Sequence, residues 1–126
     1  MPSTDSAPQS TADGQISYLS DRKPQSRRPL RGTAHLLISG RPPLPVKILD
    51  AGVSGVSIVA ALNAPVDAEC GIRFVLPTGL QILTIETKVV VQQSVFSRID
   101  DGFRVGLRFK GMSHDQTSAL RSFAGS

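Results

Sequence analysis

The residues best suited to chemistry are three arginines within five positions, Arg27, Arg28 and Arg31. A guanidinium group presents a planar fork of N–H donors that binds phosphate oxygens in pairs, and its flat face stacks on a purine. Pro29 opposes a helix here, so we expect an extended or turned segment that leads into the first strand. The segment is therefore a candidate anion-binding site, and a solvated basic linker is the competing interpretation.

Groups that could perform catalysis are few. His35 and His114 lie far apart in the sequence, and Cys70 falls inside an apolar alternation that is typical of a core. No nucleophile is paired with a base, and the histidines and the cysteine lack the spacing of zinc ligands. We expect no enzyme activity, no metal and no cofactor.

The overall composition limits the kind of protein. A chain of 126 residues with 40% hydrophobic residues has room for one compact domain. The net charge of +4 favours an anionic partner. The single cysteine excludes an internal disulfide, and the sequence contains no secretory leader and no long apolar run. We therefore expect a cytoplasmic protein that does not span a membrane.

The first 24 residues differ from the rest of the chain. Ser, Thr, Pro, Asp, Gln and Ala dominate them, a composition that predicts a disordered tail. Three aspartates against Arg22 and Lys23 give the tail a charge of −1, which leaves +5 on the remaining 102 residues. The sequence thus predicts a tail over residues 1–24 and one basic domain over residues 25–124.

From Gly32 onward, apolar residues recur with a period of two and turn residues interrupt them every eight to twelve positions. The pattern predicts six antiparallel strands, which form a barrel or a sandwich. The first two strands are expected at 33–39 and 45–49, and the sixth strand alternates most regularly, over 103–109. The alternation loses its phase near Ile82 and Leu83, which suggests a β-bulge.

A short helix is expected to close the fold. Ser113 and Gln116 have the spacing of a capping box, in which each side chain bonds the backbone N–H of the other residue. Leu120 and Phe123 then supply an apolar edge that should lie against the barrel.

A second segment gives the arginines a context. The run Asp-Ala-Gly-Val-Ser-Gly over residues 50–55 resembles a D-x-S-x-x-G turn and follows Arg31 by about twenty residues. An R-x-x-x-R segment before such a turn, in a chain predicted to form six strands and a closing helix, resembles the PilZ domain family. The resemblance covers residues 25–124, and the run over 103–109 also resembles the family's last strand.

The resemblance implies an all-β fold, a six-stranded antiparallel β-barrel with a short C-terminal helix, and a receptor for cyclic di-GMP. Arg27 and Arg31 would contact guanine and phosphate, and Arg28 could add a contact. The turn would contribute Asp50, Gly52 and Gly55. Gly52 departs from the expected serine, and the missing hydroxyl costs about 0.5–1.5 kcal/mol, or roughly two- to tenfold in affinity.

The function implied by the resemblance is that of an adaptor. Cyclic di-GMP would change its surface and so regulate a protein effector, in the control of bacterial motility, biofilm or exopolysaccharide. One alternative is a degenerate PilZ-like interaction module that binds no nucleotide. A small barrel that binds single-stranded nucleic acid fits the sequence less well, because such surfaces use exposed aromatic platforms and this chain has no Trp and one Tyr.

Overall fold

The structure, a computed structural model, describes residues 27–79 and 81–125. The tail predicted over residues 1–24 lies outside the described residues. Within the described part, six strands precede a single helix. The elements are β2 (Arg27–Leu37), β3 (Leu44–Gly52), β4 (Gly55–Ala60), β5 (Glu69–Thr78), β6 (Gln81–Ser97), β7 (Gly102–Lys110) and α1 (His114–Gly125).

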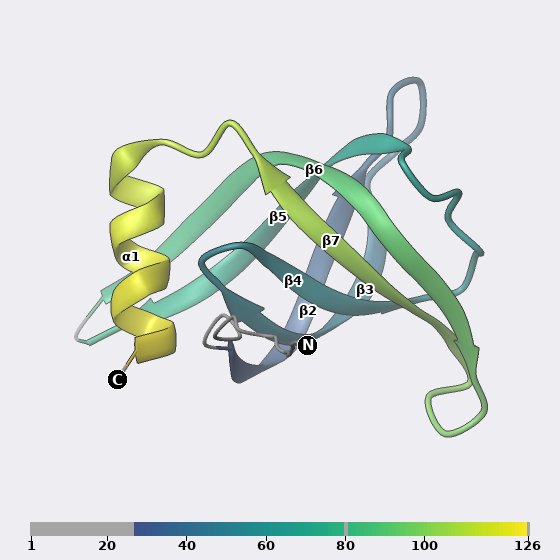
Figure 1. Ribbon diagram of the computed structural model, residues 1–126, viewed down its shortest axis with the longest axis horizontal. Helices are drawn as coiled ribbons and strands as arrows, with labels where there is room; N and C mark the ends of the chain where they lie inside the picture. Colours follow the sequence, from purple (N-terminus) through teal and green to yellow (C-terminus); the bar gives the residue numbers. More distant parts are fainter. Residues whose placement is uncertain (1–26, 80, 126) are drawn as a thin grey trace, which may run out of the picture.

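The strands form a closed barrel in the order β2, β3, β4, β7, β6, β5, and each neighbouring pair is antiparallel (Figure 1). The ring is completed by a short ladder between β2 and β5, in which residues 35–37 face residues 71–73. The all-β, six-stranded antiparallel barrel with a short C-terminal helix that the sequence predicts is therefore confirmed.

Strand alternation determines which side chains fill the barrel. Along β7, Val105, Leu107 and Phe109 are buried inside, whereas Arg104 and Arg108 are exposed outside. Every other side chain of a strand points to the same face, so one strand lines the core and carries a polar outer surface at once. Burial of one such apolar side chain contributes about 1.5–3 kcal/mol.

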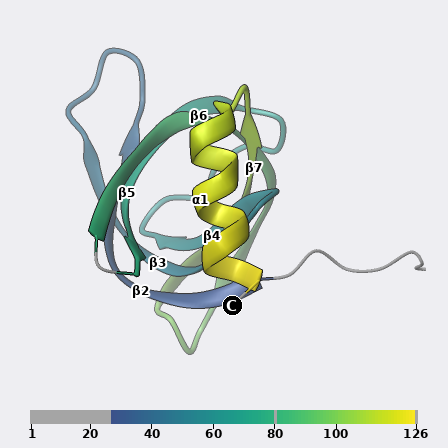
Figure 2. The ribbon, with the colours of Figure 1, turned by 90° about the vertical axis from the view of Figure 1, so that its left-hand side faces the viewer.

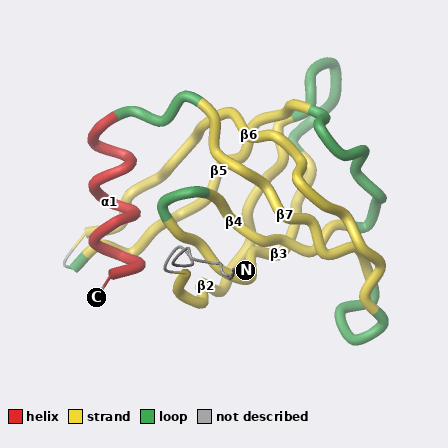
Figure 3. The backbone as a smooth tube through the Cα atoms, viewed as in Figure 1, coloured by secondary structure: helices red, strands yellow, loops and turns green. Residues whose placement is uncertain are grey.

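The helix α1 lies across one end of the barrel (Figure 2). Its N-terminus has the predicted capping box: the Gln116 backbone N–H donates to Ser113 Oγ over 3.1 Å, and the Ser113 N–H donates to Gln116 Oε1 over 3.2 Å. Leu120 and Phe123 are buried against the core, as predicted. The loops at 38–43, 61–68 and 98–101 lie at the opposite end (Figure 3).

Two details differ from the prediction. The first strand begins at Arg27 rather than at Thr33, so the arginine segment is itself part of the sheet. The bulge expected near Ile82 and Leu83 is wrong, because β6 pairs with β5 without a register shift there. The phase is lost because Ile82 is an apolar residue on the outer face, 76% exposed. The register of β6 shifts later, between Val91 and Gln93, against β7.

Candidate ligand-binding face

The two segments that carry the resemblance are neighbours in the sheet. The start of β2 pairs with the end of β3, with Arg27 opposite Gly52 and Pro29 opposite Asp50. The arginine segment is extended, as the proline predicts. Antiparallel pairing therefore brings together residues that are more than twenty positions apart in the sequence.

Arg27 is held by two polar side chains on the outer face of the barrel. Its Nη1 donates to Asp50 Oδ1 over 2.9 Å and to Ser57 Oγ over 3.3 Å. The Arg27 and Asp50 side chains are each 33% exposed, so the guanidinium is fixed but open to solvent. We call Arg27, Asp50 and Ser57 the arginine face.

Ser57 was not predicted as part of the site. It lies opposite Asp50 in the ladder between β3 and β4. Its position between the buried residues Val56 and Ile58 indicates an outward side chain, which the alternation alone could have revealed. Ser57 thus contributes a hydroxyl to the arginine face from a third strand.

Two register shifts determine where Arg31 lies. The ladder between β2 and β3 shifts between Pro29 and Gly32, and the ladder between β3 and β4 shifts between Ile48 and Asp50. Such shifts bend strands and redirect side chains. Leu30 thus points into the core at 7% exposure, while the side chain of Arg31 is exposed.

Arg31 is not joined to Arg27 and Asp50. Together with Lys47, it lines a hollow between β2 and β3 at the register shift. Over residues 27–79 and 81–125, neither Arg31 nor Lys47 makes an ion pair or a side-chain hydrogen bond. Arg31 is therefore available to an anion that approaches this part of β2, whereas the charge of Lys47 also acts on Asp100 and lowers its pKa.

Arg28 points to a different part of the molecule. Its Nη1 donates to the Phe123 carbonyl oxygen over 3.2 Å, and its Cζ lies 4.8 Å from the centroid of the Phe123 ring. A guanidinium over an aromatic face is attracted by the ring quadrupole. Arg28 therefore connects the arginine segment to the last turn of α1 and does not reach the arginine face.

The two turn glycines have different surroundings. Gly52 is buried at the end of β3. Gly55 lies opposite Arg108 of β7, and a Cβ at this position would overlap the Leu107 carbonyl oxygen. Gly55 is therefore required for the close approach of β4 and β7, whatever ligand binds nearby.

The outward arginines of the later strands also differ from one another. Arg104 pairs with Asp100 over 2.7 Å, and Arg73 lies 3.6 Å from Glu86. Hydrogen bonds from Ser97 and from Arg104 lower the pKa of Asp100. Arg108 has no acidic partner among the described residues. It lies two residues beyond Gly106 on the same strand, and Gly106 lies opposite Ser57. It is the strand arginine best placed to extend the arginine face.

No helix in the described part of the chain is long and apolar enough to cross a membrane. No protein-family profile matches the sequence, and no curated protein matches it. Among solved structures, the Bacillus subtilis inhibitor of motility (MotI/DgrA) has a TM-score of 0.73 and 15% sequence identity. The likeness covers 82% of this chain and 50% of that one, so this chain spans about half the length of its structural neighbour. At this identity the likeness establishes the fold, which agrees with the PilZ-like barrel predicted from the sequence.

Proposed function

We propose that the protein is a receptor for cyclic di-GMP, that it performs no catalysis and that it regulates a protein effector. It would act in the bacterial cytoplasm, in the control of motility, biofilm or exopolysaccharide. The observation that carries the proposal is the arginine face, where Asp50 and Ser57 orient Arg27 and leave it open to solvent. Arg31, four residues further along β2, and Arg108 of β7, which lies opposite Gly55, add positive charge to the outer surface. A structural neighbour that inhibits motility supports this class of role.

The chemistry of the face matches the chemistry of the ligand. Each phosphodiester carries one negative charge. The guanidinium N–H groups of Arg27 and Arg31 can donate hydrogen bonds to its oxygens. A guanine edge presents N–H donors, and the carboxylate of Asp50 offers only acceptors. An exposed ion pair contributes about 0–1 kcal/mol, so Arg27 can exchange its bond to Asp50 for a phosphate at little cost. Asp50 would orient the arginine before binding and a guanine base afterwards.

The surface beside Arg27 is shaped by small residues. Gly52, Gly55, Ser57 and Gly106 lie on neighbouring strands, and none has a side chain larger than a hydroxymethyl group. Gly52 and Gly55 are buried and the Gln93 side chain lies over Gly106, so Ser57 is the one of these four residues that presents a polar side chain to a ligand. Ser57 would supply the hydroxyl that is missing from position 52.

The arginine segment could also couple ligand binding to a change at helix α1. Arg28 lies between the two ligand-binding arginines, and its side chain is fixed to Phe123 of α1. Any movement of the segment on binding therefore acts on the helix that covers the barrel end. The altered surface would be presented to the effector.

Calorimetric titration of cyclic di-GMP into the full chain tests the proposal. We expect saturable heat that weakens at high salt, because phosphate contacts dominate, and no saturable heat with guanosine monophosphate at the same concentrations. Absence of heat in a protein that circular dichroism shows to be folded would refute it. That result would favour the degenerate interaction module, for which the buried Gly52 in place of serine is the supporting observation.

A further inference from the structure

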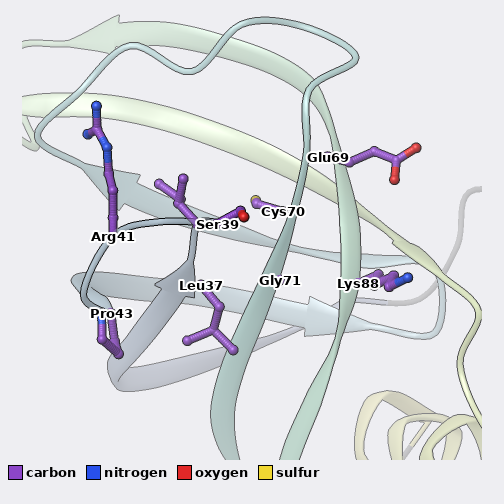
Figure 4. Close-up of a pocket in the computed structure, with 9 residues that line it drawn as sticks. Leu37, Ser39, Arg41, Pro43, Glu69, Cys70, Gly71 and Lys88 are labelled. Atoms are coloured by element: carbon purple, nitrogen blue, oxygen red, sulfur yellow. The ribbon is translucent and has the colours of Figure 1, made fainter.

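A second cationic region lies at the other end of β2. A hollow of about 450 Å³ opens on the outer surface, bounded by the turn after β2 and by strands β5 and β6 (Figure 4). Leu37, Ile38 and Pro43 form its apolar wall. Arg27 and Leu37 are ten residues apart on the same strand, so the hollow lies roughly 30 Å from the arginine face.

The floor of the hollow is formed where Leu37 meets Gly71. Leu37 of β2 lies opposite Gly71 of β5, which in turn lies opposite Lys88 of β6. The three positions therefore face the same side of the sheet, and the Leu37 side chain lies over Gly71. A Cβ at position 71 would lie 3.2 Å from Leu37 Cβ and 3.5 Å from Leu37 Cδ1, so a larger residue here would displace Leu37 and change the floor.

Some charged side chains around the hollow form ion pairs and others do not. Glu69 accepts a hydrogen bond from Lys110 Nζ over 2.6 Å, and this bond and the charge of Lys110 lower the pKa of Glu69. Arg41 and Lys88, on opposite sides of Gly71 in Figure 4, make no ion pair or side-chain hydrogen bond with residues of the described ranges. Burial raises the pKa of the Cys70 thiol, which keeps this part of the lining neutral. The hollow thus has an apolar wall with two cations at its rim: Arg41 has no acidic partner among the described residues, and Lys88 acts on Glu69 only weakly, through its charge.

We propose that this hollow binds an amphipathic monocarboxylate, with its apolar group against Leu37, Ile38 and Pro43 and its carboxylate on Arg41 or Lys88. An apolar wall with a few polar groups is the usual composition of a small-ligand site. A single negative charge suits the site better than a phosphate dianion, because Arg41 and Lys88 do not converge and the Glu69 carboxylate lies nearby. The site is independent of the nucleotide and of the arginine face.

Titration of the full chain with sodium octanoate, followed by amide NMR, tests the proposal. We expect saturable shifts at Leu37, Gly71 and Lys88, with a dissociation constant of about 1–10 mM. Octanol should bind at least about fivefold more weakly, because a neutral head group cannot pair with the cations. Octylammonium should not bind. Equal binding of octanol, shifts confined to other regions, or no saturation by about 20 mM octanoate would overturn the proposal.

A carboxylate next to an apolar group also occurs at the end of a polypeptide, so N-acetyl-leucine forms a second arm. Stronger binding of N-acetyl-leucine than of hexanoate at the same residues would identify a peptide terminus as the source of the ligand. The reverse order would identify a free acid. Both orders support the site, and failure of both probes to shift these residues would count against it.

Variants separate this site from general attraction of anions to a basic protein. The glutamine variant of the cation that holds the carboxylate, Arg41→Gln or Lys88→Gln, should weaken octanoate binding by about three- to tenfold, as expected for loss of one charge-assisted contact. Arg121→Gln removes the same charge from the exposed surface of α1 and should leave binding unchanged. Gly71→Val should abolish binding by filling the floor, provided that its spectrum shows a folded barrel. If all three glutamine variants bind octanoate equally, the site is wrong.

Discussion

The arginine face and the hollow near Leu37 both present cations on the outside of the same barrel, yet they treat those cations differently. At the arginine face, Asp50 and Ser57 orient Arg27 before any ligand arrives. At the hollow, Arg41 and Lys88 make no ion pair or side-chain hydrogen bond with the described residues, and an apolar wall lies beside them instead. The first region is prepared for a polar ligand of defined geometry, and the second is prepared for an apolar group with one charge.

This difference shows why net charge alone cannot identify a binding site. The chain carries 14 basic side chains, and several of the exposed ones are already paired with acids on the same surface. What distinguishes a candidate site is the arrangement of neighbours around the cation. A partner that orients the cation without burying it, or an apolar wall beside it, makes the cation selective for one class of ligand.

The largest expected effect is on nucleotide binding. Arg27→Ala and Arg31→Ala should each weaken cyclic di-GMP binding by about 10- to 100-fold, because each removes charge-assisted hydrogen bonds to phosphate. Lys88→Gln, at the hollow, should change the affinity less than twofold. Calorimetry measures all three. Equal losses in the three variants would mean that the nucleotide is attracted by charge alone, and the contrast between the regions would disappear.

The next effect concerns stability. Arg28→Ala removes both the hydrogen bond to the Phe123 carbonyl and the contact with its ring, so we expect a loss of about 1–2 kcal/mol in the free energy of unfolding. Amide hydrogen exchange in the last turn of α1 should become faster. Arg41→Ala, which loses no such contact, is the matched control for urea unfolding. If the two variants unfold at the same urea concentration, Arg28 does not anchor the helix.

A smaller effect is expected from Ser57→Ala. Its hydroxyl is the second acceptor for Arg27, and one net hydrogen bond corresponds to about two- to tenfold in affinity for cyclic di-GMP. Ser54→Ala serves as control, because the Ser54 carbonyl oxygen rather than its side chain bonds the Phe109 N–H. Unchanged affinity in Ser57→Ala would show that Asp50 alone orients Arg27.

The smallest effect is electrostatic and belongs to the hollow. Lys110 and, more weakly, Lys88 lower the pKa of Glu69. A carboxyl whose pKa is depressed on folding stabilises the fold above its unfolded pKa, and this contribution is lost as the pH falls through the folded value. Lys110→Gln should raise the Glu69 pKa more than Lys88→Gln does, as measured by carboxyl NMR titration. The opposite order would mean that Lys88 is not free for a ligand.

Much of the fold follows from local patterns in the sequence. The alternation along β7 and the capping box at Ser113 and Gln116 each depend on neighbouring residues only, and both were predicted correctly. The resemblance to the PilZ family led us to expect Arg27 and Asp50 in one site, and the pairing of β2 with β3 brings the two residues together.

The remainder depends on contacts between distant residues. Nothing near Arg28 in the sequence indicates that its side chain meets Phe123, 95 positions later. The register shifts depend on how three strands fit together, so the loss of alternation at Ile82 was mistaken for a bulge. In the sequence, Gly71 is an ordinary outward-facing position of a strand. That it forms the floor of the hollow is evident only from its pairing with Leu37 on one side and Lys88 on the other.

The short ladder between β2 and β5 gives the barrel a weakest line. Three residue pairs join these strands, against ten between β5 and β6, so local separation there breaks the fewest backbone bonds. Leu37 and Gly71 form one of those three pairs, and both line the hollow. A molecule bound in the hollow would therefore contact both strands of the shortest ladder in the barrel. Binding of such a molecule would slow local separation of β2 from β5, even if the average structure stayed unchanged.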